Sequence, residues 1–99
     1  MELLIKESRY FSQLDEDHFF SWLQEISGVM DVKGTPQGLI VSLASDRLSK
    51  ESIYDLLAIH ARYNLDMRQL AQFETKANSS WFRNPQAYWY KRVFGLANT

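Results

Sequence analysis

The last quarter of the chain concentrates aromatic side chains to a degree that limits how the protein can fold. Six of its fourteen Phe, Trp and Tyr residues lie between Trp81 and Phe94. Each large ring buries roughly 150–250 Å² when it packs, so such a segment is costly to leave in water. We therefore expect it to dock on the rest of the domain, on a partner, or on both, with at least one of Trp81, Tyr88 or Tyr90 partly exposed.

Length and composition predict one globular domain over residues 1–99. Apolar residues make up 45% of the chain and charged residues 23%, which is ordinary for a water-soluble protein. No apolar run approaches the ~20 residues that span a bilayer. The N-terminal segment from Met1 to Glu7 is too short and too acidic to be a secretory signal. The chain has no cysteine, which excludes disulfides and thiolate metal sites and fits a cytoplasmic protein.

Charge is divided unevenly along the chain. The net charge is −1, but residues 1–74 carry 7 basic and 12 acidic side chains, whereas residues 75–99 carry four basic and no acidic ones. Two interpretations follow: the two parts attract each other inside one fold, or an acidic face is presented to a basic partner. Nucleic acid is not an expected ligand, because the chain is not basic overall and four cations contact few phosphates.

Apolar spacing predicts an α+β protein with the order β-α-β-β-α-β-α. A ferredoxin-like split β-α-β topology is the leading expectation, and another small antiparallel sheet covered by helices is the main competitor. The elements expected, in chain order, are a strand over 2–7, a helix from Asp15 to about residue 27, a hairpin over 29–44, a helix from Ser49 to Asn64, a strand over 67–74, and a helix from Asn84 to Gly95.

Capping residues set these expected boundaries. Asp15, Ser49 and Asn84 are predicted N-caps, the last with proline at the first helical position. Asn64 is expected to end its helix in the left-handed conformation, and Gly28 to end the first helix. The nearly continuous apolar run of residues 39–43 predicts a central strand.

No catalytic or metal-binding pattern emerges from the polar residues. His18 follows three acidic residues, but a typical metal site needs three or four ligands on rigid elements. His60 lies on the apolar stripe of its helix and is expected to be structural. Glu51 and Asp55 are four residues apart and could serve as acid and base, yet a solvated helix face explains them as well. We expect no catalytic residue, no metal and no cofactor.

The chain resembles the small bacterial immunity proteins that neutralise polymorphic toxins or the toxins of contact-dependent growth inhibition. The resemblance rests on size, on the α+β layout and on the closing stretch, in which Trp81-Phe82-Arg83-Asn84-Pro85 is followed by Tyr88-Trp89-Tyr90 and Val93-Phe94-Gly95. It implies a non-enzymatic cytoplasmic protein that binds the toxin domain of its own system and blocks its active site or substrate path.

The residues predicted to bind such a partner fall into two sets. An acidic face would compete for a basic cleft and speed association, and exposed aromatic side chains would act as anchors or as packing. The acidic set is Asp15, Glu16, Asp17, Asp46, Glu51 and Asp55, and the aromatic set is Trp81, Tyr88 and Tyr90. The competing functions are a homo-oligomeric regulatory or scaffold domain that uses the C-terminal aromatic helix as its interface, and a small enzyme of unknown type.

Overall fold

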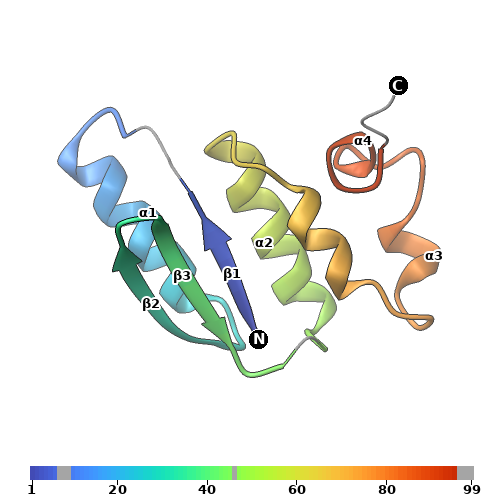
Figure 1. The fold of residues 1–99 in the computed structure, drawn as a ribbon. Helices are drawn as coiled ribbons and strands as arrows, with labels where there is room; N and C mark the ends of the chain where they lie inside the picture. Colours follow the sequence, from blue (N-terminus) through green and yellow to red (C-terminus); the bar gives the residue numbers. More distant parts are fainter. Residues whose placement is uncertain (7–9, 46, 96–99) are drawn as a thin grey trace.

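The fold was analysed in a computed structural model, which describes residues 1–6, 10–45 and 47–95. The elements run in the order β-α-β-β-α followed by short helices (Figure 1). They are β1 (Glu2–Ile5), α1 (Gln13–Glu25), β2 (Val29–Thr35), β3 (Gly38–Leu43), α2 (Lys50–Arg62), the 3-10 helix η1 (Arg68–Phe73), α3 (Ser79–Phe82) and α4 (Tyr90–Val93). The α+β prediction is therefore confirmed.

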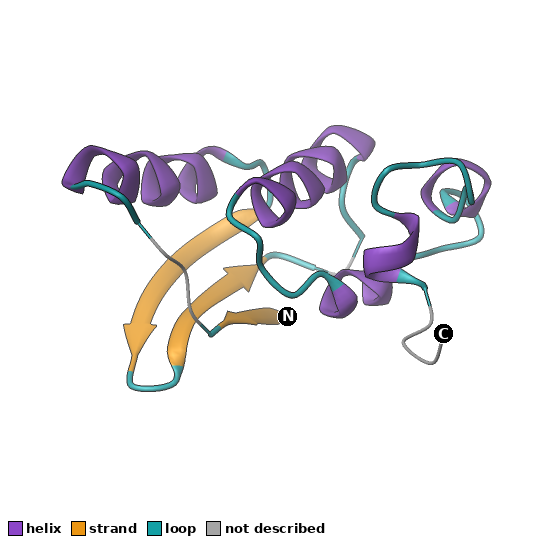
Figure 2. Ribbon diagram, turned by 90° about the horizontal axis from the view of Figure 1, so that it is seen from above, coloured by secondary structure: helices purple, strands orange, loops and turns teal. Residues whose placement is uncertain are grey.

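The described strands form one antiparallel sheet with the order β1-β3-β2. β3 is central, as its apolar run predicted, and its side chains Val41 and Leu43 are buried together with Leu3 and Ile5 of β1. Figure 2 shows α1 and α2 on the same face of this sheet. The sheet, α1 and α2 thus reproduce the first part of a split β-α-β arrangement, with β3 between the strands that α1 connects.

The predicted fourth strand is wrong. Residues 68–73 form η1, and Met67 just before it, Leu70 and Phe73 are buried at intervals of three residues. This is the spacing of a 3-10 helix. The strand prediction rested on the position of residues 67–74 between a helix and a polar loop, and not on their apolar spacing. The side chain of Asp66 accepts a hydrogen bond from the backbone N–H of Arg68 (3.0 Å) and so supports the turn at the start of η1. The ferredoxin-like order is not completed within the described residues.

The hairpin and the second long helix follow their local signals. β2 and β3 are joined by Pro36-Gln37, and Gly38 adopts a φ of 135° in close contact with the backbone of β1. Ser49 caps α2 by accepting a hydrogen bond from the N–H of Ser52 (3.1 Å). Asn64, at φ 55°, takes the predicted left-handed conformation after α2.

Three predictions of helix boundaries are corrected. The N-cap of α1 is Ser12, not Asp15. The Ser12 hydroxyl accepts a hydrogen bond from the N–H of Asp15 (3.1 Å), and the Asp15 carboxylate accepts one from the N–H of Phe11 (3.0 Å). α1 ends at Glu25, so Gly28 lies in the turn before β2. In place of the helix expected from Asn84 to Gly95, the structure has a turn, in which the Asn84 side chain accepts the N–H of Gln86 (2.9 Å), followed by the short α4.

One hydrophobic core joins the sheet, α1, α2 and the C-terminal segment. Its fully buried side chains include Phe19 and Leu23 of α1, Leu57 of α2, Phe73 of η1 and Phe82 of α3. None of the helices described has the length and apolar character that crossing a bilayer requires.

Candidate protein-interaction surfaces

The N-terminal end of α1 combines carboxylates with exposed apolar side chains. We call this group, Phe11, Leu14, Asp15, Glu16 and Asp17, the acidic surface. Phe11 is 92% exposed and Leu14 is 68% exposed. Asp17 is exposed, and Asp15 and Glu16 are half-buried. α1 carries no lysine or arginine, so this surface combines three carboxylates with two large, exposed apolar side chains.

Local hydrogen bonds hold the acidic surface in place. Asp15 accepts the backbone N–H of Phe11 and the hydroxyl of Tyr63 (3.1 Å), and Asp17 accepts the side-chain amide of Gln13 (3.0 Å). Partial burial and the neighbouring Asp15 raise the pKa of Tyr63. Tyr63 in turn packs edge-on against the buried ring of Phe19, with 4.7 Å between the centroids. The start of α1 is therefore fixed to the end of α2.

The six acidic residues predicted as one face are not brought together. α1 and α2 are antiparallel, because Tyr63 after α2 bonds Asp15, while Ser52 near the start of α2 donates to the carbonyl of Ser27 after α1 (2.8 Å). Glu51 and Asp55, both exposed, therefore lie at the other end of the helix pair from Asp15, Glu16 and Asp17. Asp46 lies outside the described residues.

The C-terminal segment forms a second candidate surface against α2, which we call the aromatic surface. It consists of Lys50, Tyr54, Trp81 and Tyr88. Tyr54 is 40% exposed and Tyr88 is 62% exposed. The ring centroids of Tyr54 and Trp81 are 5.1 Å apart, and the Lys50 ammonium lies 5.2 Å from the Trp81 ring and 5.7 Å from the Tyr54 ring. These distances suit cation–π attraction.

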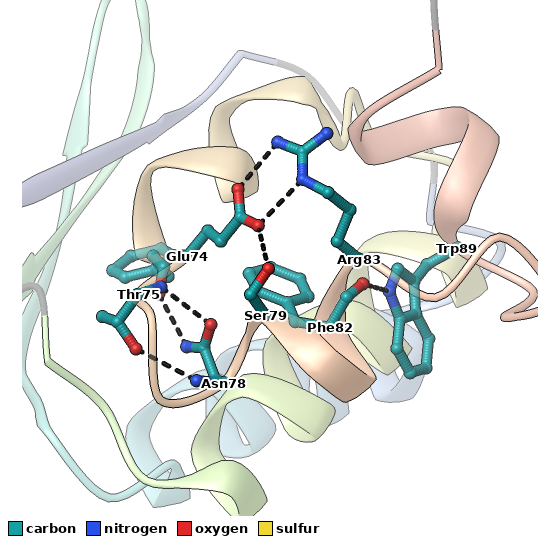
Figure 3. Close-up of polar contacts among 8 residues, drawn as sticks. Glu74, Thr75, Asn78, Ser79, Phe82, Arg83 and Trp89 are labelled. Carbon is teal, nitrogen blue, oxygen red and sulfur yellow. Dashed lines mark hydrogen bonds and ion pairs between the residues drawn. The ribbon is translucent and has the colours of Figure 1, made fainter.

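The other aromatic side chains of this segment are largely internal. Phe82, Trp89 and Phe94 are buried, and Trp81 and Tyr90 are half-buried. The prediction that at least one of Trp81, Tyr88 and Tyr90 stays partly exposed is confirmed, since all three do. The Trp89 indole N–H donates to the carbonyl of Phe82 (2.7 Å) and ties the turn before α4 to α3 (Figure 3).

An ion pair fixes α3 to the end of η1. The Arg83 guanidinium donates to both oxygens of Glu74, at 2.8 and 2.7 Å, and the Ser79 hydroxyl donates to the same carboxylate at 2.7 Å (Figure 3). These bonds lower the pKa of Glu74 to about 2. Arg83 also lies over the ring of Phe94, 4.2 Å from its centroid. The pair joins the acidic part of the sequence to the basic part, which agrees with one of the two interpretations of the charge division.

The two histidines of the chain lie in different surroundings. His18 is exposed and His60 is buried, with its Nδ1 2.7 Å from the carbonyl of Leu56. Burial lowers the pKa of His60. Over residues 1–6, 10–45 and 47–95, no three His, Asp or Glu side chains are grouped so that they could hold a metal ion.

Sequence reasoning missed Phe11, Leu14 and Tyr54. The apolar stripe of the first helix predicts that Phe19, Leu23 and Ile26 face the core. It does not predict whether an apolar residue outside the stripe stays exposed to solvent. Leu14 does fall outside the stripe, and that was the available signal for it. The exposure of Phe11 and Tyr54 depends on which segments pack beside them.

No protein-family model, curated protein or solved structure was found to match this chain.

Proposed function

We propose that this chain is a non-enzymatic protein-binding domain of the immunity type, which neutralises a cognate bacterial toxin domain in the cytoplasm by binding it. The observation that carries the proposal is the acidic surface, where Phe11 and Leu14 are 92% and 68% exposed next to three carboxylates. Large apolar side chains inside a charged rim are typical of protein-binding sites. No cofactor enters this function.

The chemistry of the acidic surface favours a basic partner. α1 contributes four acidic side chains and no lysine or arginine, so a cationic cleft is attracted before contact and the association rate rises. Phe11 and Leu14 would then be the anchors that lose water on binding. A toxin domain with a cleft for an anionic substrate has the matching charge. Asp15 supports the surface through Tyr63, and Asp17 is exposed, so that it would contact the partner.

The decisive experiment measures binding of this protein to the toxin domain encoded beside its gene, by calorimetry, together with protection of cells that express the toxin. The double variant Phe11→Ala/Leu14→Ala should bind at least about tenfold more weakly, the loss of about 1.4 kcal/mol expected on truncating anchor residues. Absence of any complex at micromolar concentration, or absence of protection, would refute the proposed function.

A charge-reversal pair locates the surface. Asp17→Lys and Asp55→Lys change the net charge equally but at opposite ends of the α1–α2 pair. We expect Asp17→Lys to slow association and weaken binding at least about tenfold, and Asp55→Lys to change affinity less than about threefold. Equal effects of the two variants would mean that net charge, and not the acidic surface, governs binding. A larger effect of Asp55→Lys would indicate that the partner binds at α2 instead of at the acidic surface.

A homo-oligomeric domain is the second candidate function, and the aromatic surface favours it. Tyr54 is exposed beside Trp81, and Tyr88 is exposed beside Trp89, whose ring also contacts those of Tyr54 and Trp81. A second copy could cover these side chains. Sedimentation velocity at micromolar to millimolar concentration tests this candidate. A monomer throughout that range leaves it without support, and an oligomer that Tyr54→Ala and Tyr88→Ala dissociate favours it over the acidic surface.

A further inference from the structure

The outer edge of β1 is closed by a side chain instead of a fourth strand. The N–H of Leu43 in β3 donates to the carbonyl of Met1 (2.7 Å), and Leu3 lies opposite Val41. Because backbone groups alternate along an antiparallel strand, those of Met1 and Leu3 point toward β3 and those of Leu4 point outward. The outward N–H of Leu4 donates to the side-chain oxygen of Gln69, at 3.2 Å.

Gln69 also connects this edge to the buried His60. Its amide nitrogen lies 3.4 Å from Nε2 of His60, and Nδ1 of His60 lies 2.7 Å from the carbonyl of Leu56. A carbonyl only accepts, so Nδ1 carries a hydrogen and Nε2 of the neutral ring is an acceptor. The hydrogen bonds therefore run in one direction: Leu4 N–H to Gln69 oxygen, Gln69 amide to His60 Nε2, and His60 Nδ1–H to Leu56.

We propose that Gln69 is a hydrogen-bond latch on the outer edge of β1, and that protonation of His60 opens it. A protonated His60 has N–H on both ring nitrogens, so Nε2 no longer accepts from the Gln69 amide. Turning the amide over satisfies His60 with the Gln69 oxygen, but it points the NH₂ group at the N–H of Leu4. The Leu4 hydrogen bond is then lost. This inference is independent of the proposed function.

The charges around His60 set the pH at which the latch opens. From the C-terminal segment, Arg92 opposes a positive charge on His60, whereas Asp66, in the loop before η1, favours it. Asp66 is paired with Arg68 of η1 (2.7 Å), and Lys6 at the end of β1 also acts on it. Burial is the largest effect and lowers the pKa of His60.

The direction of the pH dependence follows from that lowered pKa. The unfolded chain takes up the His60 proton below about pH 6.5, while the folded chain resists it. The free energy of unfolding is therefore at its full value above pH 6.5 and decreases as the pH falls, until the folded protein is also protonated. The latch is closed at neutral pH and opens only in acid.

An opened latch changes what the β1 edge can bind. The Leu4–Gln69 contact borders a pocket of about 340 Å³, whose lining includes Ile5, Lys6, Leu65 and Asp66. A freed Leu4 N–H beside that pocket is an unpaired edge donor, which is what an added peptide strand uses. The latch thus keeps an edge strand protected at neutral pH.

Amide hydrogen exchange and ¹⁵N NMR of the intact protein test the latch between pH 7.5 and 5. After correction for the intrinsic rate of exchange, the protection of the Leu4 amide should fall at least tenfold over this range, with the midpoint at which the His60 ring nitrogens titrate. The Leu3 amide, which faces β3, is the internal control and should keep its protection. Equal loss at Leu3 and Leu4 would indicate global unfolding and overturn the proposal.

The variant Gln69→Glu provides the second measurement. A carboxylate accepts from Leu4 and from protonated His60 at once, so the pKa of His60 should rise and the Leu4 amide should stay protected down to pH 5. A Gln69→Glu protein that loses Leu4 protection as the parent does would refute the latch. So would a parent protein in which His60 titrates while Leu4 protection is unchanged, or in which His60 stays neutral until the chain unfolds.

Discussion

The replacement of Trp89 by phenylalanine is a direct test of how the C-terminal segment is held. Trp89 is 6% exposed, and its indole N–H donates to the carbonyl of Phe82 at 2.7 Å. Its ring packs against those of Tyr54 and Tyr88, with 5.7 Å and 5.0 Å between the ring centroids. Phenylalanine retains one ring but removes the donor. The carbonyl of Phe82 at the end of α3 then loses its partner in a buried place.

The expected destabilisation has two parts. A buried carbonyl left without its hydrogen bond costs about 1–3 kcal/mol. Phenylalanine also lacks the five-membered ring of the indole, which is worth roughly two methylene groups of burial, or about 1–2 kcal/mol at ~0.8 kcal/mol each. We therefore expect Trp89→Phe to lower the free energy of unfolding by about 2–5 kcal/mol, a large share of the roughly 5–15 kcal/mol typical of a domain.

The matched control is Trp81→Phe. Trp81 is half-buried, and its contacts are with the rings around it and with the Lys50 ammonium, so we expect a loss of about 1 kcal/mol or less. Urea unfolding followed by circular dichroism compares the two variants without relying on tryptophan fluorescence. If Trp89→Phe costs no more than Trp81→Phe, the Trp89–Phe82 hydrogen bond does not stabilise the fold as we infer.

Further substitutions separate the remaining contributions. Gly38→Ala should destabilise the protein by at least about 1–3 kcal/mol in urea unfolding, since φ is 135° and a Cβ would overlap the carbonyl oxygen of Ile5 in β1. Gly34→Ala, whose Cβ would lie 4.0 Å from its nearest neighbour, should cost less than about 1 kcal/mol. Equal losses would contradict the role of the β1 contact. Ser49→Ala should cost about 1 kcal/mol as a lost N-cap, and an unchanged urea midpoint would count against that cap. The pKa of Glu74 is about 2 in the folded protein and ordinarily 4.5. The contribution of Glu74 to the free energy of unfolding is therefore complete above pH 4.5 and is lost as the pH falls toward 2. Urea midpoints measured over that range should fall less steeply in Glu74→Gln than in the parent, and identical slopes would refute the contribution of the ion pair.

The sequence predicted the parts of the fold whose causes are local. Ser49 and Asn64 bound α2 as expected, because capping depends on groups within one turn of the chain. The hairpin of β2 and β3 and the central place of β3 followed from a turn with glycine and proline and from a run of apolar residues. The start of α1 is also set locally, by the bonds of Ser12 and Asp15 to neighbouring backbone N–H groups, but the N-cap was predicted at Asp15 instead of Ser12.

The candidate surfaces were only partly predictable. Asp15, Glu16 and Asp17 are neighbours in the chain and so share the acidic surface. Glu51 and Asp55 were grouped with them by charge alone, and the antiparallel packing of α1 and α2 places them at the opposite end. The exposure of Phe11 depends on the absence of any described segment over the start of α1, which no nearby residue encodes.

The sequence by itself determined the α+β class, the hairpin, α2 and the need of the aromatic segment to dock, because composition, caps and apolar period act over a few residues. Tertiary structure decided that residues 68–73 form η1 instead of a fourth strand. The residues of this stretch did not by themselves distinguish a strand from a helix, and the choice depends on distant partners: the β1 edge, which Gln69 reaches 65 residues away in the chain, and the buried His60. Tertiary structure likewise decided which aromatic rings stay at the surface, because burial belongs to the packed assembly and not to any one segment.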